Sequence, residues 1–312
     1  MVSHLLVGRN TPHISLTGSV QRLITKGKKM TSKTEKWFIT GASGGLGLAL
    51  TRRVLEAGHT VVAAVRNPAA LAELSQQFSS QLVVEKLDVT DFASLPEIAK
   101  KHADSDIIVN NAGGAIIGAM EEFSEQEIEH QFALNLLSPV HITRAFLPAL
   151  RAKKQGRLIY VSSMGGRVAF PGGAFYHAAK YGLEGFAETV AQEVAEFNIK
   201  VQIIEPGSIK TNFQANVRWT EETAAYKDGT VGQLRRWIAE HGEESNSGDP
   251  VKMANAIYTL SQQPEPELRT VLGADAFQIL KGSYQKSLQS LESQQEISVS
   301  VAIEGKTGFI PE

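Results

Sequence analysis

Short β-rich runs alternate with longer segments of helical period along most of this chain, and this alternation strongly constrains its fold. The runs are residues 37–40, 60–65, 82–87, 107–110, 157–162, 200–205 and 269–272. Several runs are apolar throughout, as expected of strands that are buried on both faces. The pattern predicts an α/β fold: right-handed βαβ units in a Rossmann-like, doubly wound parallel sheet of about seven strands.

The first predicted helix illustrates how the segments between the strands are recognised. Leu46, Leu50, Val54 and Leu55 lie on one helical face, and Gly58 is placed to end the helix. No internal linker or repeat interrupts the alternation. We therefore predict a single catalytic domain over residues 36–275, followed by a C-terminal helix and tail over residues 276–312. From residue 298 onward no helical period is visible.

The first 35 residues differ from the rest of the chain. Up to residue 33 they contain no acidic residue and carry the basic residues Arg9, Arg22, Lys26, Lys28, Lys29 and Lys33. We interpret this segment as a disordered extension, because no clear amphipathic helix is visible in it. A basic, acid-poor segment is also typical of a mitochondrial transit peptide, which remains the alternative to the cytoplasmic location that we expect.

Composition excludes several classes of function. The chain has 31 basic and 33 acidic residues, a formal charge of −2, which gives no electrostatic case for nucleic-acid binding. Its apolar runs fall far short of the ~20 residues that a membrane span needs. The absence of cysteine excludes disulfides, thiol nucleophiles and cysteine-held metals. The eight histidines show no recognisable ligand spacing, so we expect no metal site.

A glycine-rich turn follows the first predicted strand. Ligands of doubly wound sheets bind at the carboxyl ends of the strands, so the residues after each strand are the most informative. The turn reads Thr40-Gly41-Ala42-Ser43-Gly44-Gly45-Leu46-Gly47. Glycines permit a tight turn and let backbone N–H groups approach a pyrophosphate at the positive end of the following helix. We predict that this turn binds the cofactor through Gly41, Ser43, Gly45, Leu46 and Gly47.

The same turn also fits the G-x-S-x-G nucleophile elbow of hydrolases, which would make Ser43 a nucleophile. Such an enzyme needs a histidine late in the chain. Downstream of the middle of the sheet only His241 is left, in a polar stretch. We therefore favour nucleotide binding and keep the serine hydrolase as an alternative.

The residues after the second strand indicate which dinucleotide would bind. An NAD site places a carboxylate here, on the ribose 2′-hydroxyl. In this chain Val65 ends the strand and Arg66 follows. A guanidinium suits a 2′-phosphate, whereas a carboxylate would repel it, so we predict NADP(H).

The next two loops are less specific. Asp88, after the third strand, is placed either to accept a hydrogen bond from the adenine amino group or to act as a turn or N-cap residue. After the fourth strand, Asn110-Asn111-Ala112-Gly113 has amides that can brace neighbouring loops and small residues that leave room for a ribose. It also fits an ordinary turn rich in Asn and Gly.

A tyrosine and a lysine follow the fifth strand with chemically useful spacing. Ser162 and Ser163 come first, and Tyr176 and Lys180 lie four residues apart, hence on one helical face. A phenol with a pKa near 10 is a poor acid–base catalyst at neutral pH, and a nearby ammonium lowers that pKa. The pair alone arises often by chance. Its place in an ordered set of post-strand motifs gives it weight.

Taken together, these motifs resemble those of the short-chain dehydrogenase/reductase family. The matching segments are Thr40-Gly41-x-x-x-Gly45-x-Gly47, Asn110-Asn111-Ala112-Gly113, Ser163, Tyr176-x-x-x-Lys180 and Pro206-Gly207-x-x-x-Thr211. They occur in the family's order and spacing over about residues 36–275. Ala64-Val65-Arg66-Asn67-Pro68 and Gly248-Asp249-Pro250 resemble the branch that contains 17β-hydroxysteroid dehydrogenase-like oxidoreductases.

The resemblance implies specific roles. Tyr176 would exchange a proton with the substrate oxygen, Ser163 would hydrogen-bond that oxygen, and Lys180 would lower the tyrosine pKa and hold the nicotinamide ribose. Asn135 would position a water in the proton relay, although without the family it reads as an ordinary helical asparagine. Pro206, Ile209 and Thr211 would wrap the nicotinamide. By analogy the protein would be a homodimer or homotetramer, through helices around residues 122–150 and 175–197.

Residues 212–247 form a long insertion after this motif. It carries Phe213, Trp219, Tyr226 and Trp237, and Leu234, Trp237 and Ile238 lie on one helical face. We hypothesise a mobile lid whose apolar underside closes over a hydrophobic substrate. The alternative is that these side chains only pack the insertion onto the body. Met164, Phe170 and Phe175, near the loop between Ser163 and Tyr176, would add apolar side chains to the wall of the substrate site.

The predicted function is that of an NADP(H)-dependent oxidoreductase. It would interconvert a ketone or aldehyde and an alcohol, on a bulky hydrophobic substrate. A second hypothesis is a catalytically silent, NADP-binding redox sensor. Such a sensor has no need of Ser163, Tyr176 and Lys180, whose joint presence favours the enzyme.

Overall fold

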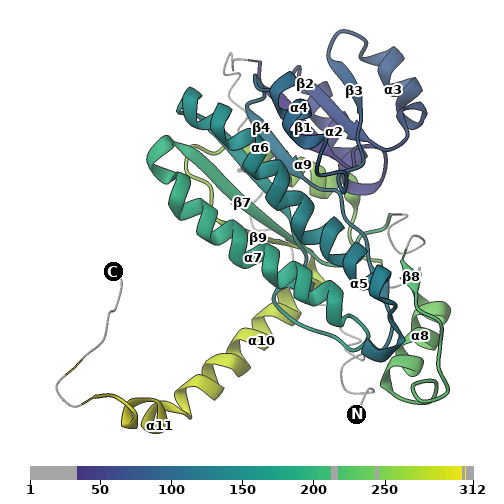
Figure 1. The fold of residues 1–312 in the computed structure, drawn as a ribbon, viewed down its shortest axis with the longest axis vertical. Coiled ribbons are helices and arrows are strands. Elements are labelled where there is room, and N and C mark those ends of the chain that lie inside the picture. The colour runs from purple at the N-terminus through teal and green to yellow at the C-terminus, as the bar shows by residue number, and fades with distance from the viewer. Residues whose placement is uncertain (1–33, 212–216, 243–245, 304–305, 307–312) are drawn as a thin grey trace, which may run out of the picture.

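A parallel sheet of seven strands forms the centre of the molecule (Figure 1). The structure is a computed structural model and describes residues 34–211, 217–242, 246–303 and 306. The strand order is β3-β2-β1-β4-β6-β7-β9, so the direction of winding reverses between β1 and β4. The strands are β1 (Lys36–Thr40), β2 (Thr60–Val65), β3 (Leu82–Lys86), β4 (Ile107–Asn110), β6 (Gly156–Val161), β7 (Ile199–Pro206) and β9 (Arg269–Leu272). Each predicted strand is found to within one residue at either end, which confirms the Rossmann-like fold.

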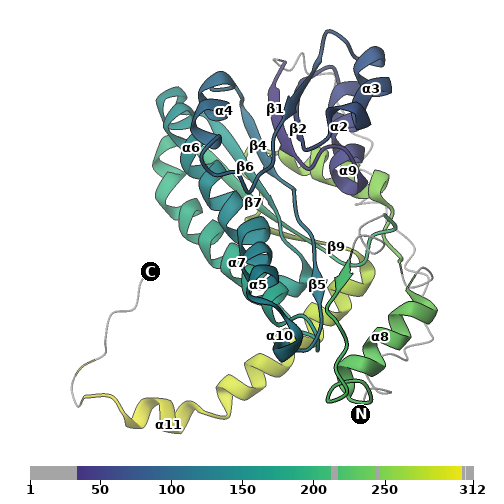
Figure 2. The same ribbon diagram turned by 45° about the vertical axis from the view of Figure 1, so that its right-hand side comes forward.

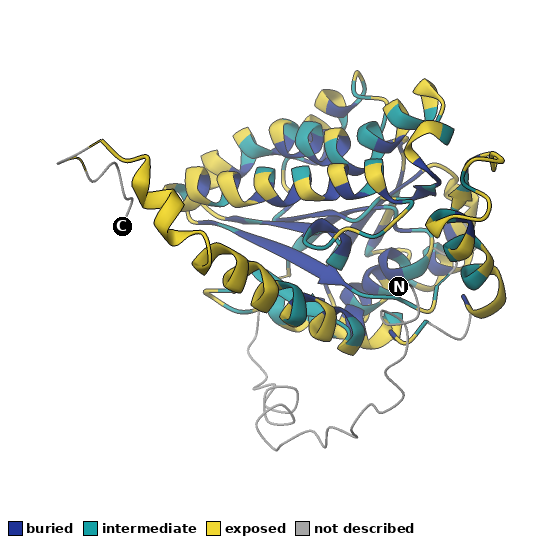
Figure 3. Cartoon of the chain, turned by 90° about the horizontal axis from the view of Figure 1, so that it is seen from below, coloured by how far each residue is buried: buried dark blue, intermediate teal, exposed yellow. Residues whose placement is uncertain are grey.

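Helices cover both faces of the sheet, and each face has its own apolar core. On one face lie α2 (Gly45–Glu56), α3 (Ala72–Gln77) and α9 (Pro250–Ser261); on the other lie α4 (Leu95–Lys101), α6 (Ser138–Lys153) and α7 (Ala174–Val194). Successive residues of β1 separate onto the two sides: Trp37 and Ile39 join the first core and Phe38 joins the second. The central strands are therefore apolar throughout because both of their faces are buried. Figure 3 shows the sheet as a buried layer beneath helices with exposed outer faces.

The remaining elements lie outside the seven-stranded sheet and the six helices that cover it. They are α5 (Glu125–Phe132), α8 (Thr230–His241), α10 (Ala274–Glu292), α11 (Gln295–Ser300), the two-stranded pair β5 (Ile116–Ile117) and β8 (Arg218–Trp219), and the short turns η2 (Pro68–Leu71), η3 (Met120–Glu122), η4 (Ala133–Leu137), η5 (Met164–Gly166) and η6 (Ala195–Phe197). The helix α8 lies within the predicted insertion. Figure 2 shows α8 beside β5 and the C-terminal helices extending away from the body.

The first helix ends at Glu56, and Gly58 follows with φ +89°, as predicted. From residue 298 onward the sequence shows no helical period, and the short helix α11 reaches three residues into this segment, to Ser300. A six-residue helix is held by local hydrogen bonds and is too short to show a clear hydrophobic period. The basic extension over residues 1–33 lies outside the described residues.

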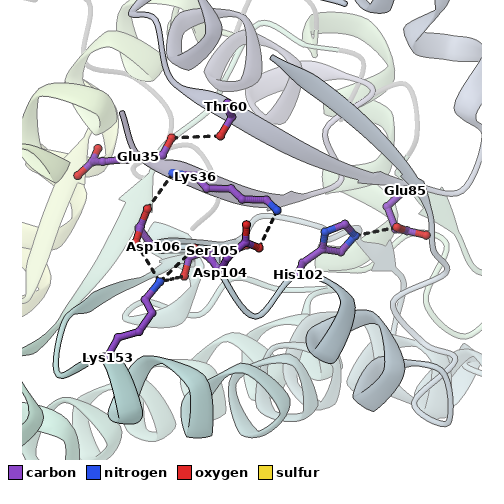
Figure 4. A network of polar contacts seen from close by, with 9 residues as sticks. All are labelled: Glu35, Lys36, Thr60, Glu85, His102, Asp104, Ser105, Asp106 and Lys153. Carbon is purple, nitrogen blue, oxygen red and sulfur yellow. Dashed lines mark hydrogen bonds and ion pairs between the residues drawn. The ribbon is translucent and has the colours of Figure 1, made fainter. Parts of the chain in front are cut away.

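A polar network fixes the amino ends of β1 and β4, at the edge opposite the carboxyl-end loops, and a separate contact joins β3 to the end of α4 (Figure 4). The backbone N–H of Lys36 donates to Asp106 Oδ2 at 3.0 Å, and Lys153 Nζ donates to Asp106 Oδ1 at 2.9 Å. The Glu85 carboxylate contacts the buried His102 ring at 2.8 Å. Because these groups satisfy one another and lie away from the glycine turn, we assign them a structural role.

No helix among the described residues is both long and apolar enough to cross a bilayer.

Candidate active site

The glycine turn after β1 has the geometry of an anion-binding turn. Gly41 and Gly45 have φ values of +65° and +53°, in the left-handed region that favours glycine. At Gly47 a Cβ atom would lie 2.3 Å from the carbonyl oxygen of Gly41, so no larger residue fits. No side chain caps α2, and its first turn carries no acidic residue. The N-terminal amides of α2 are therefore suited to a phosphate group.

The loop after β4 braces this turn. Asn111 Nδ2 donates to the carbonyl oxygen of Thr40 at 2.9 Å and to that of Gly41 at 3.3 Å. The Thr40 hydroxyl in turn accepts from the backbone N–H groups of Asn111 and Ala112, both at 3.0 Å. The side chain of Asn111 thus acts on the turn itself, which was one of the roles expected for an amide at this position.

The loop after β7 returns to the glycine turn. The N–H of Gly207 donates to Leu272 and that of Ser208 donates to the Asp275 carboxylate, at 2.9 and 2.8 Å. Ile209 forms a parallel bridge with Gly248. The Thr211 side chain lies 3.4 Å from the position that a Cβ of Gly45 would occupy. The predicted residues Ile209 and Thr211 therefore belong to the loop that follows Pro206, the last residue of β7, and reaches the glycine turn.

Arg66 and Asp88 lie at the carboxyl ends of β2 and β3. Arg66 is exposed directly after the buried Val65. Asp88 accepts hydrogen bonds from Thr90 N and Thr90 Oγ1 at 2.9 and 2.7 Å. The backbone hydrogen bond lowers the pKa of Asp88, and the charge of Arg66 acts in the same direction. Of the two roles expected for Asp88, the structure shows the turn.

Ser163 and Tyr176 meet at the carboxyl end of β6. Ser163 caps η5 and accepts from the N–H of Gly165 at 3.0 Å. Tyr176 is half-buried in the first turns of α7, directly beside Gly165. Burial raises the pKa of the Tyr176 phenol, and hydrogen bonding with Ser163 lowers it in part.

Lys180 lies one helical turn further along α7 and is buried. Its Nζ donates to the carbonyl oxygen of Val161 at 2.9 Å and lies 3.7 Å from the position that a Cβ of Gly113 would occupy. Burial lowers the pKa of Lys180 to about 8, against the opposing effect of the Glu184 carboxylate. The expected lowering of the Tyr176 pKa by Lys180 is not what this structure shows. The Lys180 ammonium group is directed at the carbonyl oxygen of Val161, and burial has the largest effect on the pKa of the Tyr176 phenol.

Asn135 lies in η4, a π-helical turn between α5 and α6. Its Nδ2 donates to the carbonyl oxygens of Gly114 and Gln131 at 2.9 and 3.1 Å, and its Oδ1 accepts from Gly114 N at 3.3 Å. A Cβ at Gly113 would lie 3.1 Å from this Oδ1 and near Lys180 Nζ. Asn135 and Lys180 therefore approach the same loop. Such π-helical turns occur frequently at functional sites.

Sequence reasoning missed His177, which holds the loop between β6 and α7. Its Nδ1 hydrogen-bonds the carbonyl oxygen of Gly165 at 2.7 Å, and its Nε2 accepts from Phe170 N at 3.0 Å. Burial lowers the pKa of His177, which favours the neutral ring that this pairing requires. The sequence offered no signal for this role except the position of His177 next to Tyr176.

Sequence reasoning also missed a buried cluster of charged side chains beside the loop between β6 and α7. Glu205, at the end of β7, is 1% exposed and lies 3.7 Å from Arg167 Nη1 and 3.6 Å from Arg269 Nε. Arg269 Nε also donates to Glu184 at 2.9 Å. Burial raises the pKa of Glu205 to about 7, and the nearby Glu184 carboxylate adds to this rise against the two arginines.

Substitution of Glu205 by glutamine should change the pH dependence of stability. A carboxyl group with a folded pKa above its ordinary 4.5 favours the folded state when protonated. Its contribution is complete below pH 4.5 and is lost as the pH rises through 7, at a cost of about 3 kcal/mol. We expect Glu205→Gln to match the wild type at pH 5 and to exceed its unfolding free energy at pH 8. Urea unfolding at both pH values measures this difference.

Glu188 provides the control for that comparison. It lies in the same cluster, and its hydrogen bond with Arg269 lowers its pKa. Glu188→Gln should therefore give no gain in stability at pH 8. Parallel pH profiles for the wild type and Glu205→Gln would contradict the assignment of Glu205.

The insertion is fixed to the body by Glu122. The carboxylate of Glu122 accepts from the N–H of Thr223 at 2.8 Å and from the hydroxyl of Thr220 at 3.1 Å. Arg235 of α8 donates to the carbonyl oxygen of Thr220 at 2.9 Å and lies over the ring of Trp219, 4.8 Å from its centroid. These contacts connect α8 and β8 to the body at η3.

Apolar side chains lie in α8 and at the start of α7, next to Tyr176. Half-buried in α8 lie Leu234, Trp237 and Ile238. Phe175, next to Tyr176, makes edge contacts with Phe123 and Phe132, with ring centroids 4.9 and 6.4 Å apart. Phe213 lies outside the described residues. The described part of the insertion thus packs onto the body, and an aromatic cluster forms around Phe175, one residue before Tyr176.

The site fits a dinucleotide better than it fits a serine hydrolase or a metal centre. The glycine turn leaves open space at Gly44, where a Cβ would meet no atom within 4 Å. In the described part of the chain, no histidine ring is hydrogen-bonded to Ser43, as a serine hydrolase requires. Among the same residues, no group of three or more His, Asp or Glu side chains is arranged to hold a metal.

Known proteins resemble this chain over most of its length. Residues 35–222 match the family model described as short chain dehydrogenase. Oxidoreductase BOA17 of Botryotinia fuckeliana is 35% identical, over 86% of this chain and 100% of its own length. The 3-ketodihydrosphingosine reductase of Bacteroides thetaiotaomicron is 33% identical, over 76% of this chain and 87% of its own. A short-chain dehydrogenase structure from Streptomyces avermitilis, 34% identical, superposes with a TM-score of 0.81, covering 88% of this chain and 100% of that one.

Proposed function

The chain belongs to the short-chain dehydrogenase family, and from this premise we propose an NADP(H)-dependent oxidoreductase that interconverts a ketone or aldehyde and an alcohol. The observation that carries the proposal is the meeting of Ser163, Tyr176 and Lys180 at the carboxyl end of β6. The braced glycine turn opens at the same edge of the sheet, after β1.

The tyrosine and serine side chains have complementary tasks. In reduction, the Tyr176 hydroxyl donates its proton to the carbonyl oxygen of the substrate, and in oxidation it removes the proton of the alcohol. Ser163 hydrogen-bonds the same oxygen and stabilises the negative charge that develops on it. When bound, the dinucleotide supplies or accepts the hydride.

Lys180 and Asn135 support the proton transfer by Tyr176. With a pKa of about 8, Lys180 remains largely protonated at pH 7 and can bind the nicotinamide ribose hydroxyls. Asn135 holds the Gly114 backbone and so fixes the loop after β4, which lies beside Lys180. In this proposal Asn135 also positions a water that passes the proton onward.

NADP rather than NAD is the proposed cofactor because Arg66 stands at the end of β2 without a carboxylate at that position. The residues that would hold the dinucleotide are Gly41, Ser43, Gly45, Leu46 and Gly47 at the pyrophosphate, Arg66 at the 2′-phosphate, Asp88 and Asn111 along the adenosine and ribose, and Pro206, Ile209 and Thr211 at the nicotinamide.

Substitution of Arg66 tests this preference. Loss of a charge-assisted hydrogen bond costs about 1.5–3 kcal/mol, so Arg66→Ala should raise the KM for NADPH by at least about tenfold. The KM for NADH should change little, because NADH lacks the 2′-phosphate. Arg52→Ala, which removes an exposed arginine of α2 that pairs with Gln77, is the control. Equal losses with both cofactors would contradict the role of Arg66.

A bulky hydrophobic substrate is the proposed substrate class. The ring of Phe175, which precedes Tyr176 in the chain, contacts those of Phe123 and Phe132. The insertion adds Trp219 and the apolar side of α8. A relative named 3-ketodihydrosphingosine reductase, whose name specifies a ketone, supports a ketone as the reacting group. The decisive experiment is oxidation of NADPH, followed at its absorbance band, against a panel of carbonyls. Activity on small charged carbonyls alone would reject the hydrophobic site.

A further inference from the structure

The C-terminal helix α10 carries an apolar stripe that the described residues leave largely exposed. Its inner side is packed, since Ala276 and Leu280 are buried against the body. Phe277, Tyr284, Leu288 and Leu291, at 54%, 42%, 55% and 66% exposure, follow at intervals of seven, four and three residues. At 100° per residue these four side chains fall on one side of the helix. We call them the arm stripe.

The position of α10 leaves the arm stripe accessible from outside. The helix starts at the end of β9, and its outer part and α11 extend beyond the body as an exposed arm (Figures 1 and 3). Tyr284 contacts the body through Arg167, whose guanidinium lies 5.3 Å from the ring centroid. Leu288 and Leu291 lie beyond that contact. Exposed apolar side chains in such a row mark an interaction surface.

We propose that the arm stripe is an interface between two copies of this chain, in which two α10 helices pack antiparallel about a two-fold axis. Lys281 and Glu292 lie on the same flank of the stripe, eleven residues or about three turns apart. An antiparallel pairing centred between them sets Lys281 of each copy opposite Glu292 of the other. In this register Tyr284 faces position 289 of the second copy, one residue from Leu288. The axis of the charge pattern and that of the Tyr284–Leu288 pair therefore agree to within half a residue, as an isologous interface requires.

The composition of α10 argues against a membrane surface as the occupant. Within the helix Lys281 and Lys286 are balanced by Asp275 and Glu292, so its net charge is zero. Helices that bind anionic lipid surfaces carry a polar face rich in Lys and Arg. The remaining polar residues of α10 are Ser and Gln, which suit a protein interface.

The absence of cysteine from the chain makes a cross-linking test direct. Leu288→Cys places a thiol on the arm stripe, and Ser290→Cys places one on the opposite side of the same helix. With a short bismaleimide and dilute protein, Leu288→Cys should give a covalent dimer and Ser290→Cys should not. This contrast holds whether or not the bodies of the two copies also associate elsewhere. Absence of the product from Leu288→Cys, or equal product from both variants, would overturn the proposal.

Charge reversal tests the register. In the Leu288→Cys background, Lys281→Glu should abolish the cross-link because it sets two carboxylates opposite each other, and addition of Glu292→Lys should restore it. Failure of the double reversal to restore the product, with all variants folded by circular dichroism, would reject the antiparallel register. The wild type should not sediment with vesicles of phosphatidylcholine and phosphatidylserine. Sedimentation that Leu288→Glu removes would assign the stripe to a membrane instead.

Discussion

Substitution of Tyr176 by phenylalanine is expected to lower kcat by about 10³-fold, the typical contribution of a positioned general acid. The change removes one hydroxyl from a ring that is half-buried beside Gly165, so the packing of the ring is preserved. Binding of NADPH should stay within a factor of about three, because the glycine turn and Arg66 are untouched. Steady-state turnover and a fluorescence titration of NADPH measure the two quantities separately.

Tyr181→Phe is the matched control for this substitution. Tyr181 lies on the same helix, five residues on, with its ring exposed to solvent, and the variant should keep wild-type turnover. Full activity of Tyr176→Phe would refute the proposed proton donor. The two alternative functions give different results. A redox sensor would bind NADPH without turnover in the wild type itself, and a hydrolase would lose activity with Ser43→Ala and not with Tyr176→Phe.

The sheet was predictable because its strands are buried on both faces. Runs such as Thr60–Val65 and Ile107–Asn110 contain almost only apolar residues, so their ends are visible as changes in polarity. Parallel strands then place their following loops at one edge of the sheet. This rule alone brought Gly45, Asn111 and Thr211 to one place, and the structure has Asn111 bonded to the turn and Thr211 packed against Gly45.

The local chemistry of the site was less predictable, because it depends on contacts between distant segments. Helical spacing correctly made Tyr176 and Lys180 neighbours along α7, yet it could not show that Lys180 would be directed at Val161 of β6. The π-helical turn that holds Asn135 has no sequence period of its own, since its bonds reach Gly114 in another loop. In the sequence, Glu205 is one residue of a mainly apolar strand. Its raised pKa arises from burial beside Glu184, which only the folded structure shows.

Substitution of Gly47 by alanine should damage both stability and cofactor binding. The new Cβ would lie 2.3 Å from the Gly41 carbonyl oxygen and 2.4 Å from Asn111 Nδ2. Either the turn or the Asn111 side chain must move, which breaks the hydrogen bonds between the two loops. Overpacking of this kind costs about 1–3 kcal/mol, and the loss of the hydrogen bonds adds to that cost. We expect a melting temperature lower by roughly 5–10 °C and an NADPH affinity weaker by about 100-fold, equal to ~2.8 kcal/mol.

Gly44→Ala separates this steric effect from a general sensitivity of the turn. Gly44 has extended backbone angles, φ −159° and ψ 166°, and a Cβ there would meet no atom within 4 Å. Its stability without cofactor should therefore lie within about 1 kcal/mol of the wild type, the small cost of alanine at a helix N-cap. Thermal unfolding of both variants without cofactor, followed by calorimetric titration with NADPH, makes the comparison. Equal melting temperatures for Gly47→Ala and Gly44→Ala would show that the close approach of Gly47 to Gly41 and Asn111 is not what requires glycine.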